Sequence, residues 1–470
     1  RLVLDLVVNH TSDEHPWFEE ARKSRHNPYY NYYHWWPAEK GEPPLRLSYF
    51  DEEGNAWTYN KPTDSYYLHY FSRKQPDLNW ENPEVRQEIF DMMRFWFDKG
   101  IDGFRMDSIS LIAKDPSFPL IDSKKYPDIF SFYAKEPRLH LYLHEMNRQV
   151  LSKYDCMSVG EGSAVMVDDV AKFVDPAREE LNMLYHFDAA RIRNTTLPDN
   201  PESGIDYSLI ALKKMFTEWD KAVDKGWPSI YLGNHDQPRM VSRFGSDKDE
   251  FRALSAKMLI TFLLTMKGTP YWFAGDEIGM RNIRFDRIEN YNDIDTINRY
   301  KKAKAEGKDP QAVLDEQKET GRDNARTPFQ WDRSPEAGFT AGTPWLKVNP
   351  DYTWINVTDE EKDPTSILNY FKKVVSFRKE NPSLIYGSYH LLDAENPQSY
   401  TFLRKTGADT YLIMLNFSPK AAISTPGIDM SNAHVLLDNY GARSHMAPQK
   451  DITLRPFEAI VFQLNHPVYE

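Results

Sequence analysis

The sequence is short of cysteine and of long apolar runs. Cys156 is the single cysteine among 470 residues, which excludes an intrachain disulfide. This composition favours the cytoplasm as the location, with the periplasm as the alternative. No apolar run is long enough to cross a bilayer and no signal peptide is visible, so we expect no membrane as a partner.

Positive charge is in deficit as well. The chain has 58 lysine and arginine residues against 70 aspartate and glutamate residues, which gives a net charge of -12. An acidic surface repels nucleic acid and anionic membranes, so we expect no nucleic acid as a partner either. The charge is compatible with a small neutral substrate.

The sequence does contain a regular succession of apolar runs and amphipathic stretches. Six apolar runs end in polar residues, and they lie at 2–8, 103–106, 157–160, 184–187, 229–232 and 270–273. Such runs are typical of parallel strands buried on both faces, and helical spacing at 83–99 and 251–266 indicates helices between them. A doubly wound open sheet is the alternative, but its glycine-rich phosphate loop is missing. We therefore predict an α/β fold, a (β/α)8 barrel with polar groups at the carboxyl ends of its strands.

Three segments interrupt this succession and predict further domains. Residues 11–74 are an aromatic and proline-rich insertion, large enough for a separate domain B. Residues 281–321 are polar and helical, which predicts a lid-like insertion. Alternating apolar and polar residues within 382–470 predict a C-terminal antiparallel β-sandwich. The catalytic barrel, domain A, then comprises residues 1–10 and 75–381.

Three acidic residues follow three of the apolar runs. Asp107, Glu161 and Asp236 each stand at the predicted carboxyl end of a strand in a separate βα unit. Hydrolysis of a glycosidic bond needs two carboxyl groups that flank the anomeric carbon. A strand-end aspartate also often caps the next helix, so one acid alone would be weak evidence. Three acids at three strand ends make a stronger pattern.

Four short blocks carry a resemblance to a known family. The blocks Asp5–His10, Gly103–Asp107, Val159–Glu161 and Asn234–Asp236 resemble the four signature regions of glycoside hydrolase family 13. Gln75–Asn79 and Gly321–Trp331 resemble markers of its oligo-1,6-glucosidase branch. The resemblance implies that the six runs are the third to eighth barrel strands and that domain B follows strand 3. The first two strands appear absent from this chain, so we expect further residues upstream.

The resemblance also implies roles for the three acids. Asp107 resembles the nucleophile, Glu161 the general acid and base, and Asp236 the third acid that holds sugar hydroxyls. Arg105 precedes Asp107 by two residues, so both side chains point to the same side of a strand. A guanidinium in that place would keep the nucleophile ionised, although it could also simply bridge two barrel acids.

Further residues resemble the family's sugar-binding groups. His10 and His235 resemble the histidines that bind hydroxyls of the glucose being cleaved. Arg322 resembles an arginine that closes the pocket, and its usual partner lies in the missing upstream stretch. Phe71 would stack on the sugar, with core packing as the alternative. Arg239 would line the aglycone side, with a buried salt bridge as the alternative.

The implied activity is that of a retaining exo-acting α-glucosidase on short oligosaccharides or disaccharides. Ser108 follows the nucleophile where the branch has Val, Ala or Thr, so the linkage stays open. Gly162–Val165 reads Gly-Ser-Ala-Val where the branch often has Met-Pro-Gly-Val. A sucrose isomerase or transglucosidase is the alternative, but the isomerase Arg-Leu-Asp-Arg-Asp motif is replaced at Arg191–Thr195. A remote alternative is a non-catalytic relative, such as the ectodomain of a transporter heavy chain, which the three acids disfavour.

The remaining expectations concern cofactors and assembly. We expect no required cofactor. The missing strands carry a calcium site in many family members, so structural calcium stays an alternative and the metal content is undecided. We expect a monomer or a homodimer.

Overall fold

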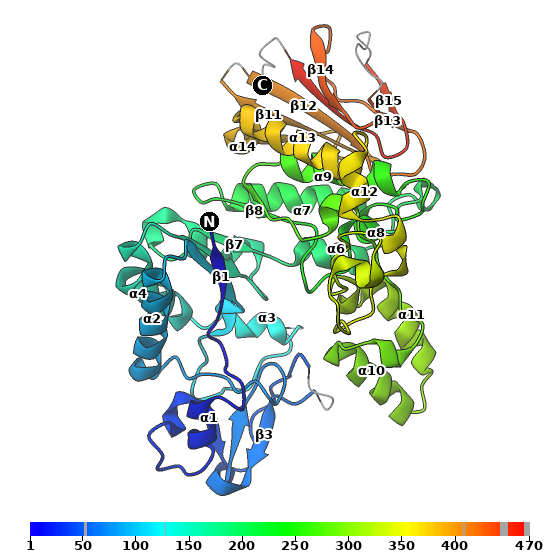
Figure 1. The fold of residues 1–470 in the computed structure, drawn as a ribbon. Helices are drawn as coiled ribbons and strands as arrows, with labels where there is room; N and C mark the ends of the chain where they lie inside the picture. The colour runs from blue at the N-terminus through cyan, green and yellow to red at the C-terminus, as the bar shows by residue number, and fades with distance from the viewer. Residues whose placement is uncertain (51–53, 127, 408, 442–449, 465–470) are drawn as a thin grey trace. The chain divides into compact units, whose positions relative to one another are not determined.

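A computed structural model describes residues 1–50, 54–126, 128–407, 409–441 and 450–464. The chain divides into two compact units, shown in Figure 1. Unit 1 contains Arg1–Phe187 with Ala222–Pro228, and unit 2 contains Asp188–Lys221 with Ser229–Glu470. Within the described ranges, no helix is long and apolar enough to cross a membrane.

Unit 1 is built on a parallel sheet. Its strands follow the order β1-β5-β6-β7, and their bounds are β1 Val3–Val7, β5 Gly103–Asp107, β6 Met157–Glu161 and β7 Met183–Tyr185. The register pairs Val7 with Asp107 and Glu161 with Tyr185, so the carboxyl ends of neighbouring strands lie side by side. This register is what gathers polar side chains at one edge of the sheet.

Helices lie beside this sheet in Figure 1. The longest are α2, Pro83–Asp98, and α4, Arg138–Gln149. Helix α2 begins where the Asn82 side chain accepts a hydrogen bond from the main-chain nitrogen of Glu84, and Gly100 follows it with a φ of 96°. The shorter helices of this unit are α1 Pro16–Ala21, α3 Phe130–Tyr133 and α5 Ala171–Val174.

The insertion after β1 forms a small antiparallel sheet. Its strands follow the order β2-β4-β3, with the bounds β2 Trp35–Pro37, β3 Trp57–Asn60 and β4 Ser65–Leu68. The rings of Tyr33 and Tyr67 pack edge-on against Phe18, each with a centroid separation of 5.0 Å. Aromatic packing of this kind explains why the segment is rich in tyrosine and tryptophan.

Unit 2 contains two short parallel strands and most of the helices. Strands β8, Ser229–Ile230, and β9, Thr269–Pro270, are shorter than the predicted runs. Gly275 follows β9 with a φ of 102°. Helix α9, Arg252–Thr265, is buried along most of its length. The other helices are α6 Asp188–Thr195, α7 Leu209–Ala222, α8 Met240–Phe244, α10 Ile294–Ala305, α11 Pro310–Thr320, α12 Val357–Lys362, α13 Ile367–Glu380 and α14 Ser383–Tyr386.

The C-terminal part of unit 2 is antiparallel. A five-stranded sheet has the order β10-β11-β12-β16-β14, with the bounds β10 Ser388–Leu392, β11 Ser399–Thr406, β12 Asp409–Asn416, β14 Ala433–Asp438 and β16 Ala459–Leu464. A second sheet pairs β13, Ala422–Ser424, with β15, Ile452–Leu454. Apolar side chains from both sheets form one buried cluster that includes Met414, Ile452 and Phe462. This is the two-layer arrangement expected of a β-sandwich.

Candidate active site

A single guanidinium in unit 1 joins the two acids that the sequence proposes as nucleophile and acid/base. Arg105 Nη1 donates to Asp107 Oδ1 over 2.7 Å, and Arg105 Nη2 donates to Glu161 Oε2. Asp107 ends β5 and Glu161 ends β6, the neighbouring parallel strand. The two carboxyl groups therefore lie on the same side of the sheet, within reach of one side chain.

The charge of this guanidinium is stabilised by its neighbours. Burial lowers the pKa of Arg105, but Tyr185, Asp107 and Asp5 outweigh burial and raise that pKa above its ordinary value. Arg105 Nη1 also donates to Asp5 Oδ1 over 2.7 Å. The guanidinium therefore places a permanent positive charge beside the Asp107 carboxyl group.

Glu161 has two further partners that the sequence analysis missed. The hydroxyl of Tyr185 donates to Glu161 Oε2 over 2.8 Å, and the hydroxyl of Ser163 donates to Glu161 Oε1 over 2.9 Å. Tyr185 ends β7, so its place in the strand series could have indicated it. Ser163 stands where this sequence departs from its branch, and that departure was the available signal.

His10 lies at the end of the β1 segment. Burial is the main reason that its pKa falls from the ordinary value of 6.5 to about 4, so the imidazole is neutral near pH 7. The side-chain amide of Gln75 donates to His10 Nε2 over 3.0 Å. The Phe71 ring lies 5.1 Å from the His10 ring, and Phe71 also packs against Tyr49. Phe71 thus contacts both a predicted site residue and the neighbouring apolar cluster.

A buried ion pair supports this end of the sheet. The side chains of Lys114 and Asp77 are both inaccessible to solvent, and Lys114 Nζ lies 3.1 Å from Asp77 Oδ2. Lys114 also donates to Asn9 Oδ1 over 2.6 Å, and the Asn9 amide donates to Asp77 Oδ1 over 3.3 Å. Sequence reasoning missed Lys114, whose one signal is a charge directly after the mostly apolar stretch 109–113.

The third predicted acid, Asp236, belongs to unit 2. Arg326 Nη2 donates to Asp236 Oδ1 over 2.7 Å, and Arg322 Nη1 donates to the same oxygen over 3.4 Å. His235 Nε2 lies 3.2 Å from Asp236 Oδ2. Asp236 is therefore surrounded by groups that fix its carboxylate and can bind hydroxyls.

Arg322 has a partner within the described part of the chain. Arg322 Nη2 donates to Asp293 Oδ1, and the Asp293 side chain is almost fully buried. Asp293 also caps helix α10, where its carboxylate accepts a hydrogen bond from the main-chain nitrogen of Thr296. The sequence analysis placed the usual partner of Arg322 upstream and missed Asp293, because an aspartate before a helix is typical of a cap.

Arg239 occupies a place other than the expected aglycone surface. It is 2% exposed, and it donates to the main-chain oxygens of Ala274 and Ala325 over 2.6 and 3.2 Å. Its Nη1 lies 3.7 Å from Asp276 Oδ1. Burial lowers the pKa of Arg239, and Asp276 opposes that effect. The structure favours the alternative of a buried ion pair, because the turn at Gly275 folds over the guanidinium.

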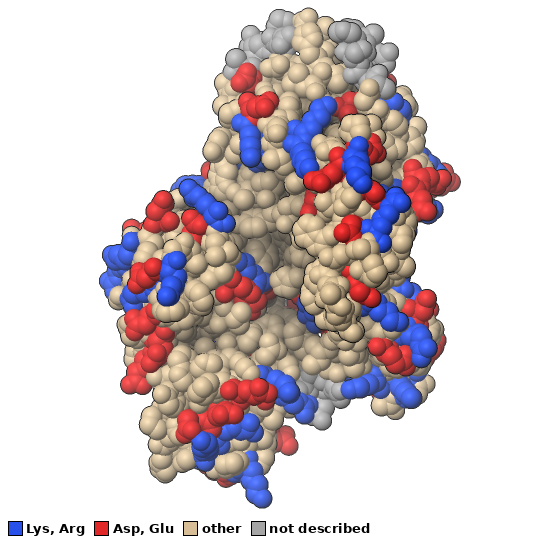
Figure 2. Space-filling model, in the orientation of Figure 1, with Lys and Arg blue, Asp and Glu red and all other residues tan. Residues whose placement is uncertain are grey.

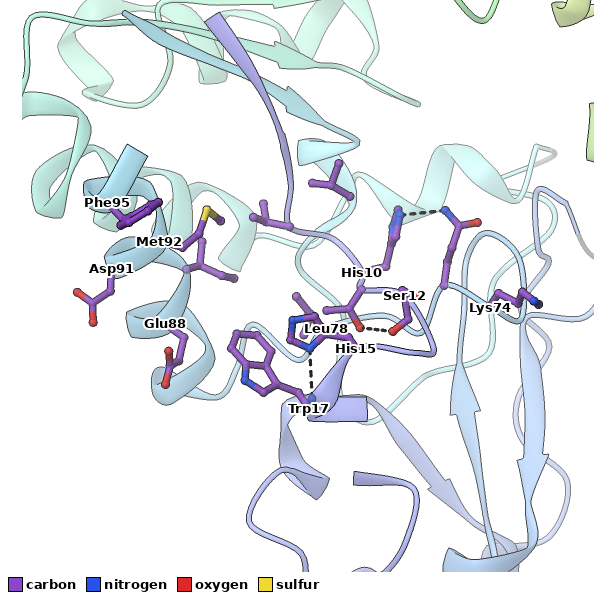
Figure 3. Close-up of a pocket in the computed structure, with 15 residues that line it drawn as sticks. His10, Ser12, His15, Trp17, Lys74, Leu78, Glu88, Asp91, Met92 and Phe95 are labelled. Atoms are coloured by element: carbon purple, nitrogen blue, oxygen red, sulfur yellow. Dashed lines mark hydrogen bonds between the residues drawn. The ribbon is translucent and has the colours of Figure 1, made fainter. Parts of the chain in front are cut away.

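A cavity in unit 1 is a different feature from the carboxyl pair. It has a volume of about 800 Å³ and lies beside the end of β1 and helix α2 (Figure 3). His10, Trp17, Met92 and Phe95 are among its lining residues. Asp107 and Glu161 are not among them, so the cavity does not contain the proposed chemistry.

Two further features concern ligands, namely groups that could bind a metal ion and the distribution of surface charge. Among the described residues, no group of three or more His, Cys, Asp or Glu side chains is arranged to hold a metal ion. On the face drawn in Figure 2, the described lysine and arginine side chains are interspersed with acidic ones.

Comparisons with known proteins identify the family of the chain. The α-amylase catalytic domain matches residues 1–387. The oligo-1,6-glucosidase of Parageobacillus thermoglucosidasius is 48% identical over 478 residues, which cover 99% of this chain and 84% of that protein. The oligo-1,6-glucosidase of Bacillus cereus is 45% identical over 474 residues, which cover 99% of this chain and 83% of that protein.

A solved structure is similar in both fold and sequence. A crystal structure of a trehalulose synthase variant bound to Tris superposes with a TM-score of 0.92 at 38% identity, covering 99% of this chain and 84% of that one. Together these relatives confirm the predicted fold, a (β/α)8 barrel with a C-terminal β-sandwich, and the predicted class of enzyme, a glycoside hydrolase. The chain belongs to the α-amylase family, glycoside hydrolase family 13.

Proposed function

We propose that the protein is a retaining, exo-acting α-glucosidase that hydrolyses terminal α-glucosyl bonds of short oligosaccharides. The observation that carries this proposal is the pair of carboxyl groups on one guanidinium, Asp107 and Glu161 on Arg105. Retaining glycosidases need two carboxyl groups close enough for one to attack the sugar while the other protonates the leaving oxygen. Relatives called oligo-1,6-glucosidases, which span almost the whole chain, support the substrate class.

The reaction proceeds by double displacement. A carboxylate oxygen of Asp107 attacks the anomeric carbon while the Glu161 carboxylic acid gives its proton to the departing glycosidic oxygen. This step forms a β-glucosyl ester on Asp107 and releases the leaving sugar as an alcohol. Glu161, now a carboxylate, takes a proton from water, and the water oxygen displaces Asp107 from the sugar. The product is α-glucose, and both carboxyl groups return to their starting states.

The other site residues bind the sugar and orient it for the reaction. His10 is neutral and can exchange hydrogen bonds with sugar hydroxyls, as can His235, Asp236 and Arg322. The chemistry uses carboxyl groups and water, so we propose that it requires no cofactor. We also propose a cytoplasmic location and a monomer or homodimer as the working assembly, with the periplasm as the alternative location.

Proton NMR of the first products tests the mechanism. We expect α-glucose before mutarotation, and initial release of β-glucose would contradict double displacement. Asp107→Asn should lower kcat by several orders of magnitude with an unchanged circular dichroism spectrum. Glu161→Gln should slow disaccharides much more than activated aryl glucosides, because a good leaving group needs little protonation.

A sucrose isomerase or transglucosidase is the second candidate, favoured by the structural likeness to a trehalulose synthase. In the region of the missing isomerase motif, Arg193 forms an ion pair with Asp206 in the neighbouring loop of unit 2. Product analysis on sucrose separates the candidates. Glucose plus fructose supports hydrolysis, whereas isomaltulose or trehalulose supports isomerisation. Rates on isomaltose, maltose, trehalose and nigerose then define the linkage.

A further inference from the structure

An exposed tryptophan in unit 2 lies next to the residues that hold Asp236. Trp345 is 60% exposed, yet its indole Nε1 donates a 2.8 Å hydrogen bond to the main-chain oxygen of Arg326. Arg326 Nη2 in turn donates to Asp236 Oδ1 over 2.7 Å. The polar edge of the indole is thus satisfied by the segment that fixes Asp236, while much of the ring surface is open to solvent.

The indole is also fixed in orientation. The side-chain amide of Asn292 donates to the main-chain oxygen of Trp345, and Asn292 directly precedes Asp293, the partner of Arg322. The Phe339 ring stands perpendicular to the indole, at 89° with a centroid separation of 5.0 Å. Because these contacts already restrict the side chain, a ligand that packs on it would lose little additional conformational entropy.

The surroundings of this ring suit a sugar. The carbon–hydrogen faces of a pyranose are apolar and pack flat against an aromatic ring, whereas its hydroxyls need polar partners at the rim. Arg326 accepts the indole hydrogen bond and donates through Nε to the main-chain oxygen of His235. The side chains of both residues contact Asp236 and are 32% and 50% exposed, so polar groups lie in the same hydrogen-bonded segment as the ring. An exposed apolar ring rimmed by polar side chains is typical of a binding surface.

We infer that Trp345 is a stacking platform for the sugar unit on the leaving-group side of the cleaved bond. The inference rests on the proposed exo-acting α-glucosidase, in which Asp236 holds the terminal glucose. Trp345 is joined to Asp236 through Arg326, so it lies beside the glucose-binding groups and not among them. In a pocket that admits only a terminal glucose, a sugar unit bound beside that glucose is the leaving sugar.

Two substrates separate this role from the chemistry. Maltose and isomaltose have a leaving sugar that needs the platform, whereas α-glucosyl fluoride has a leaving fluoride that does not. In Trp345→Ala we expect the ratio of kcat/KM for the preferred disaccharide to that for the fluoride to fall about tenfold, mainly through KM. Trp345→Phe keeps an aromatic face and should keep most of the ratio.

A second exposed tryptophan provides the matched control. Trp331 is 50% exposed, but its ring packs on Phe329 at 4.6 Å rather than on the Arg326 segment. Trp331→Ala should leave the ratio at the wild-type value. Thermal denaturation of each variant identifies a general loss of folding, which would lower both rates and not their ratio.

The outcomes distinguish the two proposals. If wild-type protein hydrolyses neither the fluoride nor any disaccharide, the proposed function fails. If wild-type protein is active but Trp345→Ala keeps the wild-type ratio, the platform is refuted and the glucosidase stands. An equal fall in the ratio for Trp331→Ala and Trp345→Ala also refutes a specific platform.

Discussion

Replacement of Lys114 by methionine tests whether the buried ion pair holds the His10 end of the sheet. Both side chains of the Lys114–Asp77 pair are inaccessible to solvent, and Asp77 Oδ2 has no hydrogen-bond partner among the described residues other than this contact at 3.1 Å. Lys114→Met would therefore leave a buried carboxylate without an opposite charge, although Oδ1 would keep its hydrogen bonds from Asn9 and Tyr70. Removal of one partner of such a pair costs about 3–5 kcal/mol of unfolding free energy.

The expected shift is large enough for calorimetry. A domain of this size loses about 2–4 °C in Tm for each kcal/mol, so we expect the transition that includes unit 1 to fall by roughly 10 °C. The double variant Lys114→Met/Asp77→Asn buries no charge and should recover most of that loss. Lys23→Met is the matched control, because its pair with Glu20 is exposed and should contribute less than about 1 kcal/mol.

Activity provides a second measurement. Lys114 also donates to Asn9, the neighbour of His10, so its loss should raise KM for disaccharides even below the unfolding transition. The reasoning would be refuted if Lys114→Met shifted Tm no more than Lys23→Met, or if the double variant were less stable than Lys114→Met alone. Either result would mean that the protein does not need the ammonium to compensate Asp77.

Three further predictions concern single side chains. Ser163→Ala should lower kcat/KM for disaccharides about fivefold, because Glu161 loses one hydrogen bond. Ser163→Thr should restore kcat/KM. A kcat/KM of Ser163→Ala equal to that of the wild type would contradict the prediction. The folded protein binds the His10 proton more weakly than the unfolded chain does. The resulting stabilisation, about 3 kcal/mol, is complete above pH 6.5 and is lost as the pH falls toward about 4. His10→Gln should flatten the dependence of Tm on pH over that range. An unchanged slope of Tm against pH would contradict the lowered pKa of His10 in the folded protein. Ala164 has a φ of 62°, so Ala164→Gly should raise the free energy of unfolding in urea by about 1 kcal/mol, whereas destabilisation would argue against strain there.

The strands that carry the site were predictable from the sequence because parallel strands are buried on both faces. The continuous apolar runs before Asp107 and Glu161 lie on β5 and β6. Arg105 points to the same side as Asp107, as the two-residue spacing predicts, and it also contacts Glu161. The predicted runs before Asn234 and Gly275 are longer than the strands β8 and β9 that the structure contains, because an apolar run shows burial and does not show where strand pairing ends.

The partners of the site residues were much harder to predict. Tyr185 and Lys114 contact Glu161 and Asn9, which are distant in the chain, and their local sequence gives no such information. Ser163 lies two residues from Glu161, and its departure from the branch pattern was the one local signal. Asp293 has two functions at once, as a helix cap and as the partner of Arg322, and the sequence displays only the first. The fold decides which side chains lie next to one another, and the neighbouring residues in the sequence do not show it.

The hydrogen bonds of Glu161 indicate which of its oxygens delivers the proton. Oε2 accepts from the charged Arg105 and from Tyr185, and a proton on that oxygen would face a guanidinium. Oε1 has only the neutral hydroxyl of Ser163 as its described partner, and charge-assisted bonds are roughly twice as strong as neutral ones. A glycosidic oxygen can therefore displace Ser163 from Oε1 more easily than it can displace Arg105 from Oε2. Because a serine hydroxyl both donates and accepts, Ser163 can bind Oε1 whether or not it carries the proton, and in the proposed mechanism we therefore expect Oε1 to be the oxygen that protonates the leaving group.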